Sequence, residues 1–232
     1  MRALVLQHAR TGPPALLGAW LTARGIAFDV HDASTGEPLP PIDAYTMLAS
    51  LGAAASPNDE HRPEVLAEAG LMRAAIDRGI PVLGLCFGGQ MLAQVLGGAV
   101  ERAPRAELGW HTVETADRQT VAPGPWLQWH YDRFITPPGA ELLAWNDAAP
   151  QAFRHGIHLG TQFHPESTIE IVRGWAHKDR AKIAQHGVDD PDALLDRGAR
   201  HADQARENAF DLFDSFLAHA RAREAEGESI SA

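Results

Sequence analysis

The chain has 232 residues, and 45% of them are hydrophobic, which is the ordinary globular range and enough to bury a full core. The formal net charge of −10 argues against binding to nucleic acid or to anionic membranes, because both need clustered Lys and Arg. No apolar run approaches the ~20 residues of a transmembrane helix. The single cysteine, Cys86, excludes an internal disulfide and favours a reducing cytoplasm.

The first half of the chain alternates short apolar runs with helical patterns. Strands are predicted at residues 2–7, 26–31, 44–51 and 80–85, and helices at residues 13–24, 63–78 and 88–96. The run at 80–85 is apolar on both faces, which is typical of a parallel strand buried between two layers of helices. The alternation predicts a three-layer α/β fold with a flavodoxin-like, mostly parallel sheet and helices on both faces. A ligand should then lie outside the carboxyl ends of the strands.

The second half differs, because Pro, Gly and Asn separate its strand-like pieces. These pieces are residues 109–115, 126–130, 141–145, 151–154 and 157–163, and they predict antiparallel additions to the same domain. Residues 167–222 have a helical pattern with a weak break at 188–191. We therefore expect a single domain over residues 1–222 and a polar, frayed tail over residues 223–232.

The strongest motif is Gly-Leu-Cys-Phe-Gly-Gly-Gln at residues 84–90, where an apolar strand passes into a helix. Small residues around a nucleophile at such a junction allow the sharp, strained turn of a nucleophile elbow. The thiol of Cys86 would face the positive end of the following helix, which favours the reactive thiolate. The backbone N–H of Phe87 could stabilise an oxyanion at the same point. The alternative is a buried core cysteine that behaves as a small hydrophobic side chain.

A second motif, Gln-Phe-His-Pro-Glu at residues 162–166, supplies the partners that a cysteine nucleophile needs. His164 ends a strand-like run and could act as the base, and Glu166 could orient its imidazole across a turn stiffened by proline. By itself this motif would be interpreted as a solvated loop. Its pairing with the elbow favours a catalytic triad.

Together the two motifs resemble the class I glutamine amidotransferases, whose signature is Gly-x-Cys-x-Gly-x-Gln followed downstream by His-Pro-Glu. Residues 51–60, 129–132, 137–139 and 151–154 extend the likeness to stand-alone members related to the amidotransferase half of GMP synthetase. The resemblance implies hydrolysis of the γ-carboxamide of glutamine, or of a related γ-glutamyl amide, through a γ-glutamyl thioester and without a cofactor. It also implies three groups of site residues: the catalytic Cys86, His164 and Glu166, the oxyanion-hole residues Gly52, Ala53 and Phe87, and the substrate-binding residues Gln90, His130 and Asp132.

The sequence departs from this family in the loop that would supply a second oxyanion donor. The family has Gly-Gly there, whereas this chain has Gly52-Ala53 followed by two more alanines. Alanine keeps the backbone N–H, but a positive φ at position 53 would disfavour it by about 1 kcal/mol relative to glycine. On that condition we expect weak activity without a partner and a gain of turnover in Ala53→Gly.

Three functional interpretations stay open from the sequence. The chain could be a glutaminase subunit that supplies ammonia to a separate synthetase, a free-standing γ-glutamyl hydrolase or peptidase, or a catalytically weak binding or regulatory module on the same fold. The Gly-x-x-x-x-Gly-Lys-Ser/Thr phosphate-binding motif is absent, so we expect any synthetase to be another polypeptide. His155 and His158 lie close together in the sequence and could suggest a metal site. We expect no metal, because no Cys or carboxylate cluster completes such a site.

Overall fold

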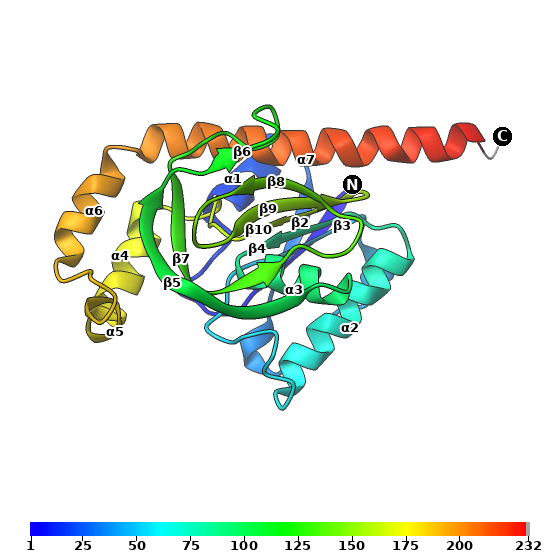
Figure 1. Ribbon diagram of the computed structural model, residues 1–232. Helices are drawn as coiled ribbons and strands as arrows, with labels where there is room; N and C mark the ends of the chain where they lie inside the picture. The colour runs from blue at the N-terminus through cyan, green and yellow to red at the C-terminus, as the bar shows by residue number, and fades with distance from the viewer. Residues whose placement is uncertain (231–232) are drawn as a thin grey trace.

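The structure is a computed structural model that describes the backbone of residues 1–230 and the side chains of residues 1–223 and 225 (Figure 1). Its strands are β1 (Arg2–Gln7), β2 (Ala27–Asp32), β3 (Met47–Ser50), β4 (Val82–Leu85), β5 (Ala99–His111), β6 (Glu114–Thr115), β7 (Trp126–Ile135), β8 (Glu141–Trp145), β9 (Pro150–His155) and β10 (His158–Thr161). Its helices are α1 (Ala15–Ala23), α2 (Pro63–Asp77), α3 (Phe87–Val95), α4 (Ile169–Lys178), α5 (Arg180–Ala184), α6 (Pro191–Ala199) and α7 (Ala202–Ile230).

The main sheet is parallel at its centre and antiparallel at one edge. Its strand order is β2-β1-β3-β4-β10-β9-β8-β6. The first five of these strands pair in parallel, and β9, β8 and β6 are added antiparallel. This arrangement confirms the predicted α/β class, the parallel core and the antiparallel additions (Figure 1). Because β4 and β10 are adjacent and parallel, the loops that follow them leave the same edge of the sheet.

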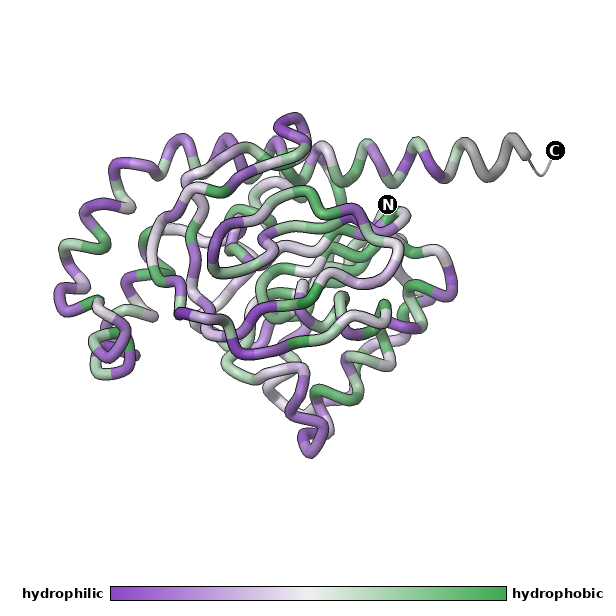
Figure 2. Tube along the Cα trace, in the orientation of Figure 1, coloured by the Kyte–Doolittle hydropathy of each residue, from purple (hydrophilic) through white to green (hydrophobic). Residues whose placement is uncertain are grey.

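Residues of β1 alternate between two hydrophobic cores, one on each face of the sheet. Ala3 and Val5 pack with residues of α1 and α7, whereas Leu4 and Leu6 pack with residues of α2 and α3. All four side chains are fully buried, as expected for a central strand covered on both faces. Figure 2 shows the same distribution, with hydrophobic segments concentrated in the central strands.

A ribbon of β5 and β7 stands beside the main sheet and is only partly predicted by the sequence. The prediction at residues 109–115 was too short, because β5 begins at Ala99, and β7 is also longer than predicted. The pairing of the two strands is irregular between Arg102 and Glu107. Pro104 lies in that stretch and has no N–H to donate to a strand ladder. Because this irregular stretch interrupts the alternation of apolar and polar residues, the sequence pattern does not predict the first half of β5.

The C-terminal part of the chain is helical, as predicted. Helices α4 and α6 pack beside the β5–β7 ribbon, and α7 packs against α1 on one face of the main sheet (Figure 1). The predicted break at residues 188–191 falls at the junction of α5 and α6. Within residues 1–230, no helix combines the length and hydrophobicity needed to cross a membrane.

Helix α7 continues past residue 223, where the sequence predicted a frayed tail, and ends at Ile230. Glu is the most frequent residue of that stretch, and it favours helix formation. Residues 231–232 of the expected tail lie outside the described part of the chain. The division into one domain and a tail stays a prediction.

Candidate active site

Cys86 occupies a strained turn between β4 and α3. Its backbone has φ 54° and ψ −107°, and Ala15 is the only other non-glycine residue with a positive φ in the described part of the chain. Such a conformation costs an L-residue about 1–3 kcal/mol and persists only where the surrounding structure enforces it. The residue is 6% exposed, and it stands at the helix end that favours an anion.

Three glycines let α3 approach the sheet more closely than any side chain would allow. A Cβ atom on Gly88 would lie 2.1 Å from the carbonyl oxygen of Ser50 in β3. A Cβ atom on Gly89 would lie 2.3 Å from the carbonyl oxygen of Thr161 in β10. One on Gly84 in β4 would lie 2.4 Å from the carbonyl oxygen of Gly88. The motif glycines therefore fix the helix, and with it the thiol, against three neighbouring strands.

His164 and Glu166 follow β10, the neighbour of the strand that leads to Cys86. The Nδ1–H of His164 donates to Oε1 of Glu166 at 2.8 Å, and the two side chains are 4% and 5% exposed. The other imidazole nitrogen, Nε2, is buried without a well-aligned partner among the described residues. Burial would lower the pKa of His164, but the neighbouring Cys86 and Glu166 outweigh it and raise this pKa well above its usual value. The structure thus brings the three expected catalytic residues together.

The imidazole of His164 is held between a glycine and an aromatic side chain. A Cβ atom on Gly52 would lie 2.6 Å from Cε1 of the imidazole, so no side chain fits at that position. Trp175 of α4 packs edge-on against the other surface, with ring centroids 5.1 Å apart and an interplanar angle of 62°. The indole N–H of Trp175 donates to the carbonyl of Thr11 at 2.9 Å, which fixes the indole in turn. These contacts restrict the imidazole to one orientation.

The loop after β3, residues 51–55, is called the oxyanion loop below. Its Leu51 carbonyl accepts the N–H of Gly88 in the elbow at 3.2 Å, so the loop and the elbow are joined. The N–H groups of Gly52, Ala53 and Phe87 have no hydrogen-bond partner in the described part of the chain and are available to a ligand. Unpaired main-chain donors next to a nucleophile are the composition of an oxyanion hole.

The strain expected at Ala53 is not present. That expectation depended on a positive φ, and Ala53 is not among the residues that have one. An alanine therefore fits this backbone without strain, and the physical reason for expecting a handicapped loop is removed. The position in the loop that requires glycine is Gly52, one residue earlier, because a Cβ atom there would clash with the imidazole of His164.

Of the three residues expected to bind substrate, two are occupied within the protein. The Gln90 Nε2 donates to the carbonyl of Asp132 at 3.0 Å and to Oε1 of Gln162 at 3.3 Å. The Nδ1–H of His130 donates to the same Asp132 carbonyl at 2.9 Å, and the His130 side chain is 1% exposed. The carboxylate of Asp132 is 30% exposed and lies 3.3 Å from Arg102. Gln90 and His130 therefore position the backbone at Asp132, and the carboxylate of Asp132 is the accessible polar group.

Glu107 is a buried carboxylate that the sequence analysis missed. It is 1% exposed and accepts hydrogen bonds from His130 at 3.0 Å, Gln151 at 2.7 Å and Asn146 at 2.6 Å. Burial would raise its pKa, but the hydrogen bond and charge of His130, together with Asn146, lower it. Its place between the apolar Ala106 and Leu108 of β5 is the signal that could have identified it, because an unpaired carboxylate is costly to bury.

His155 and His158 do not form a metal site. The Nδ1 of His158 accepts the N–H of Val82 at 3.2 Å. Burial, and then the nearby His155, lower the pKa of His158 to about 4. Within residues 1–230, no group of three or more His, Cys, Asp or Glu side chains is arranged to hold a metal ion. His158 thus serves the sheet as a neutral hydrogen-bond acceptor.

Comparisons with known proteins point to one family. The model of the family described as "Glutamine amidotransferase class-I" matches residues 54–172, about half of the chain. The GMP synthase (glutamine-hydrolyzing) of Thermomicrobium roseum is 46% identical over 99 residues, which are 39% of this chain and 19% of that protein. The chain thus spans about a fifth of the length of this relative.

Two further relatives match over most of their length. The glutamine amidotransferase-like protein YfeJ of Salmonella typhimurium is 29% identical over 180 residues, which are 71% of this chain and 75% of that protein. The crystal structure of a glutamine amidotransferase from Methylobacillus flagellatus superposes with a TM-score of 0.85 at 25% identity and covers 94% of both chains. The predicted likeness to stand-alone members is therefore confirmed.

Proposed function

The chain belongs to the class I glutamine amidotransferases, and we propose that it hydrolyses the γ-carboxamide of glutamine, or of a related γ-glutamyl amide, through a thioester on Cys86. One observation carries the proposal: a cysteine in a strained turn meets a buried histidine whose Nδ1–H is held by Glu166 at 2.8 Å. A cysteine that only filled the core would need neither the strained turn nor a buried imidazole beside it.

In the first half-reaction, the thiolate of Cys86 attacks the amide carbon, and the carbonyl oxygen becomes an oxyanion. The N–H groups of Ala53 and Phe87 are the proposed donors to this oxygen. The raised pKa of His164 favours the protonated imidazole, which gives its proton to the departing nitrogen. The C–N bond breaks, ammonia leaves, and a γ-glutamyl thioester remains on the sulfur.

In the second half-reaction, the neutral imidazole of His164 takes a proton from water, and the resulting hydroxide attacks the thioester carbon. The C–S bond breaks, glutamate leaves, and the thiolate and imidazolium are restored. Glu166 orients the imidazole through both steps and stabilises its charged form. We propose that the partly exposed carboxylate of Asp132 receives the α-ammonium group of the substrate, and that no cofactor takes part.

The destination of the ammonia distinguishes two versions of this function. The likeness to a glutamine-hydrolyzing GMP synthase favours a synthetase as the recipient of the ammonia. The match to YfeJ over 75% of its length favours a stand-alone hydrolase of γ-glutamyl amides or peptides as the second candidate. Either version needs a compartment that keeps the lone thiol reduced, and we propose the cytoplasm.

The test is a hydrolysis assay of the purified chain with glutamine and with a panel of γ-glutamyl amides. We expect turnover of at least one substrate, and none by Cys86→Ser, whose oxygen is a far weaker nucleophile in this setting. Circular dichroism should show that the variant keeps its fold. Full activity in Cys86→Ser would refute the thioester. Preference for glutamine supports the synthetase-linked version, and preference for a bulkier amide supports the stand-alone hydrolase.

A further inference from the structure

A further buried histidine–carboxylate pair lies beside the oxyanion loop. His8 follows β1, and its Nε2 lies 2.6 Å from Oε2 of Glu68 in α2, with the two side chains 10% and 1% exposed. The other carboxylate oxygen of Glu68 accepts the hydroxyl of Ser50 at 2.5 Å. Burying such a pair carries a large desolvation cost and by itself adds little to stability. Its position suggests a different role.

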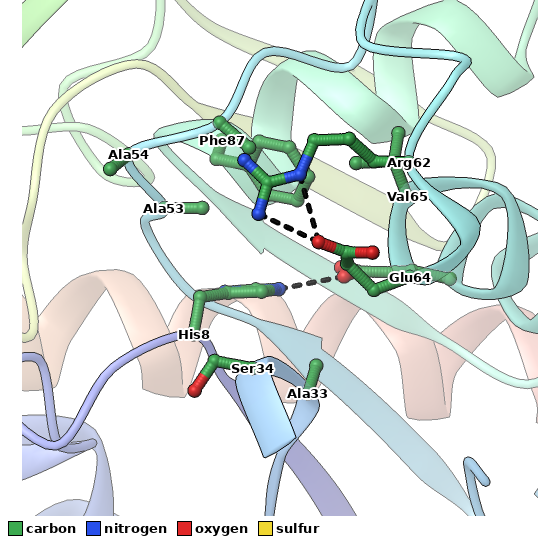
Figure 3. Close-up of a pocket in the computed structure, with 11 residues that line it drawn as sticks. His8, Ala33, Ser34, Ala53, Ala54, Arg62, Glu64, Val65 and Phe87 are labelled. Atoms are coloured by element: carbon green, nitrogen blue, oxygen red, sulfur yellow. Dashed lines mark hydrogen bonds and ion pairs between the residues drawn. The ribbon is translucent and has the colours of Figure 1, made fainter. Parts of the chain in front are cut away.

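His8 contacts both elements that would form the oxyanion hole. The imidazole packs edge-on against the Phe87 ring, with centroids 4.9 Å apart and an interplanar angle of 65°. The carbonyl of Gly52 lies close enough to the same imidazole to raise its pKa. His8, Ala53 and Phe87 line one pocket, and Figure 3 shows their side chains around it. The volume of this pocket is about 90 Å³. A single side chain thus joins the oxyanion loop to the elbow.

The charge state of His8 fits this role. Burial would lower its pKa, but the charge and hydrogen bond of Glu68, and then the Gly52 carbonyl, raise it above the usual value. Asp32, at the end of β2, acts in the same direction. A protonated imidazole has two N–H donors, and one of them serves Glu68. The Nδ1 atom is buried without a well-aligned hydrogen-bond partner among the described residues, and the nearby Gly52 carbonyl is the acceptor that we assign to it.

We propose that His8 is a positioning residue that orients the Gly52–Ala53 peptide so that the Ala53 N–H faces the oxyanion. In a trans peptide the C=O and the N–H point in opposite directions, so a carbonyl held toward His8 turns the N–H away from it. That N–H has no partner in the described part of the chain. Glu68 and Ser50 keep the imidazole in place. The inference rests on the proposed thioester chemistry, because the oxyanion forms only there.

The test separates acyl transfer from simple reactivity of the thiol. His8→Leu removes both donors, and we expect kcat to fall at least about tenfold with little change in KM, since complete loss of one oxyanion donor lowers turnover about 10²- to 10³-fold. Alkylation of Cys86 by iodoacetamide should keep its rate, because that displacement forms no oxyanion. His8→Gln should recover part of kcat, because its amide can still donate to a carbonyl.

Val65→Ala is the matched control. Val65 lines the same pocket, and its truncation loosens the pocket wall without removing a hydrogen bond to the oxyanion loop. We expect its kcat to stay close to that of the wild type. Unchanged kcat in His8→Leu would overturn the inference. So would an equal loss in Val65→Ala, or a parallel loss of alkylation in His8→Leu, since these would indicate general loosening or an effect on the thiol.

A crystal structure of His8→Leu gives a readout that does not depend on activity. We expect the Gly52–Ala53 peptide to be rotated or split between two orientations. A single, unrotated peptide would overturn the positioning role. If the wild-type chain hydrolyses no γ-glutamyl amide, the proposed function fails, and the orientation of this peptide still decides whether His8 controls it.

Discussion

Two buried histidine–carboxylate pairs meet at Gly52, and they differ in what the second nitrogen of each imidazole faces. In the pair His164–Glu166 it faces the thiol of Cys86, and in the pair His8–Glu68 it faces the Gly52 carbonyl. A carboxylate raises the pKa of the histidine in both. The same kind of pair thus has two roles. In His164–Glu166 the imidazole is a proton donor beside the nucleophile, and in His8–Glu68 it is a rigid support beside a peptide group. The neighbour of the free nitrogen decides the role.

The largest expected effect is a difference in kcat between variants of the two carboxylates, Glu166 and Glu68. Glu166→Gln should lower kcat about 10²- to 10⁴-fold, because the imidazole that transfers the proton loses its orienting and charge-stabilising partner. Glu68→Gln should lower kcat much less, since it acts only through His8 and the peptide. Steady-state kinetics with the best substrate of the panel measures both. Equal losses would remove the distinction between a proton-transferring pair and a supporting pair.

The His8–Glu68 pair should matter more for the stability of the fold than for kcat. Glu68→Gln should lower the free energy of unfolding by about 3–5 kcal/mol, because it leaves a buried imidazolium without its counter-charge. The folded pKa of His8 is raised above 6.5, so the pair stabilises the fold fully below pH 6.5 and less as the pH rises through that raised pKa. Urea unfolding over a pH series measures the gap in the free energy of unfolding between the wild type and Glu68→Gln. A gap that widens at alkaline pH would contradict the charged pair.

The spacing of each pair explains which one the sequence could predict. His164 and Glu166 are two residues apart in a motif, whereas His8 and Glu68 are 60 residues apart on different elements. The elbow around Cys86 and its meeting with His164 were also predictable, because both follow strands of a parallel sheet and such strands end at one edge. Contacts between distant elements leave no such local pattern.

Other misses have similar causes. Glu107 joins residues of β7, of β9 and of the turn after β8, and nothing near it in the sequence indicates these partners. The first half of β5 was missed because Pro104 interrupts the alternation that identifies a strand. The strain expected at Ala53 followed from a family comparison, and only coordinates reveal the sign of a φ angle. Backbone angles and long-range polar contacts are therefore the parts that needed the structure.

His158 is another buried histidine, and it sharpens the comparison because none of the hydrogen bonds or causes of its pKa shift involves a carboxylate. Burial, and then His155, lower its pKa from 6.5 to about 4. The folded state therefore prefers the neutral form, and its contribution is complete above pH 6.5 and declines as the pH falls toward 4. The loss should reach about 3 kcal/mol. Unfolding of the wild type and of His158→Leu across that range measures it, and parallel pH dependences would contradict the assignment.

The smallest expected effect is that of Ala53→Gly. Because Ala53 does not have a positive φ, the change should leave kcat within about twofold and lower stability by no more than about 1 kcal/mol through added chain entropy. Gly52→Ala is the matched control one residue earlier, where a Cβ atom would lie 2.6 Å from the His164 imidazole. We expect that variant to lose most of its turnover. A strong gain in Ala53→Gly would mean that the loop is handicapped after all.

The central claim is that His164 activates Cys86 as the nucleophile for γ-glutamyl amides. The most direct measurement is peptide mass spectrometry after incubation with a diazoketone analogue of glutamine, which alkylates the residue that attacks it. We expect one adduct on the peptide that contains Cys86, formed much more slowly in His164→Asn. An adduct elsewhere, or equal labelling of wild type and His164→Asn, would contradict the claim.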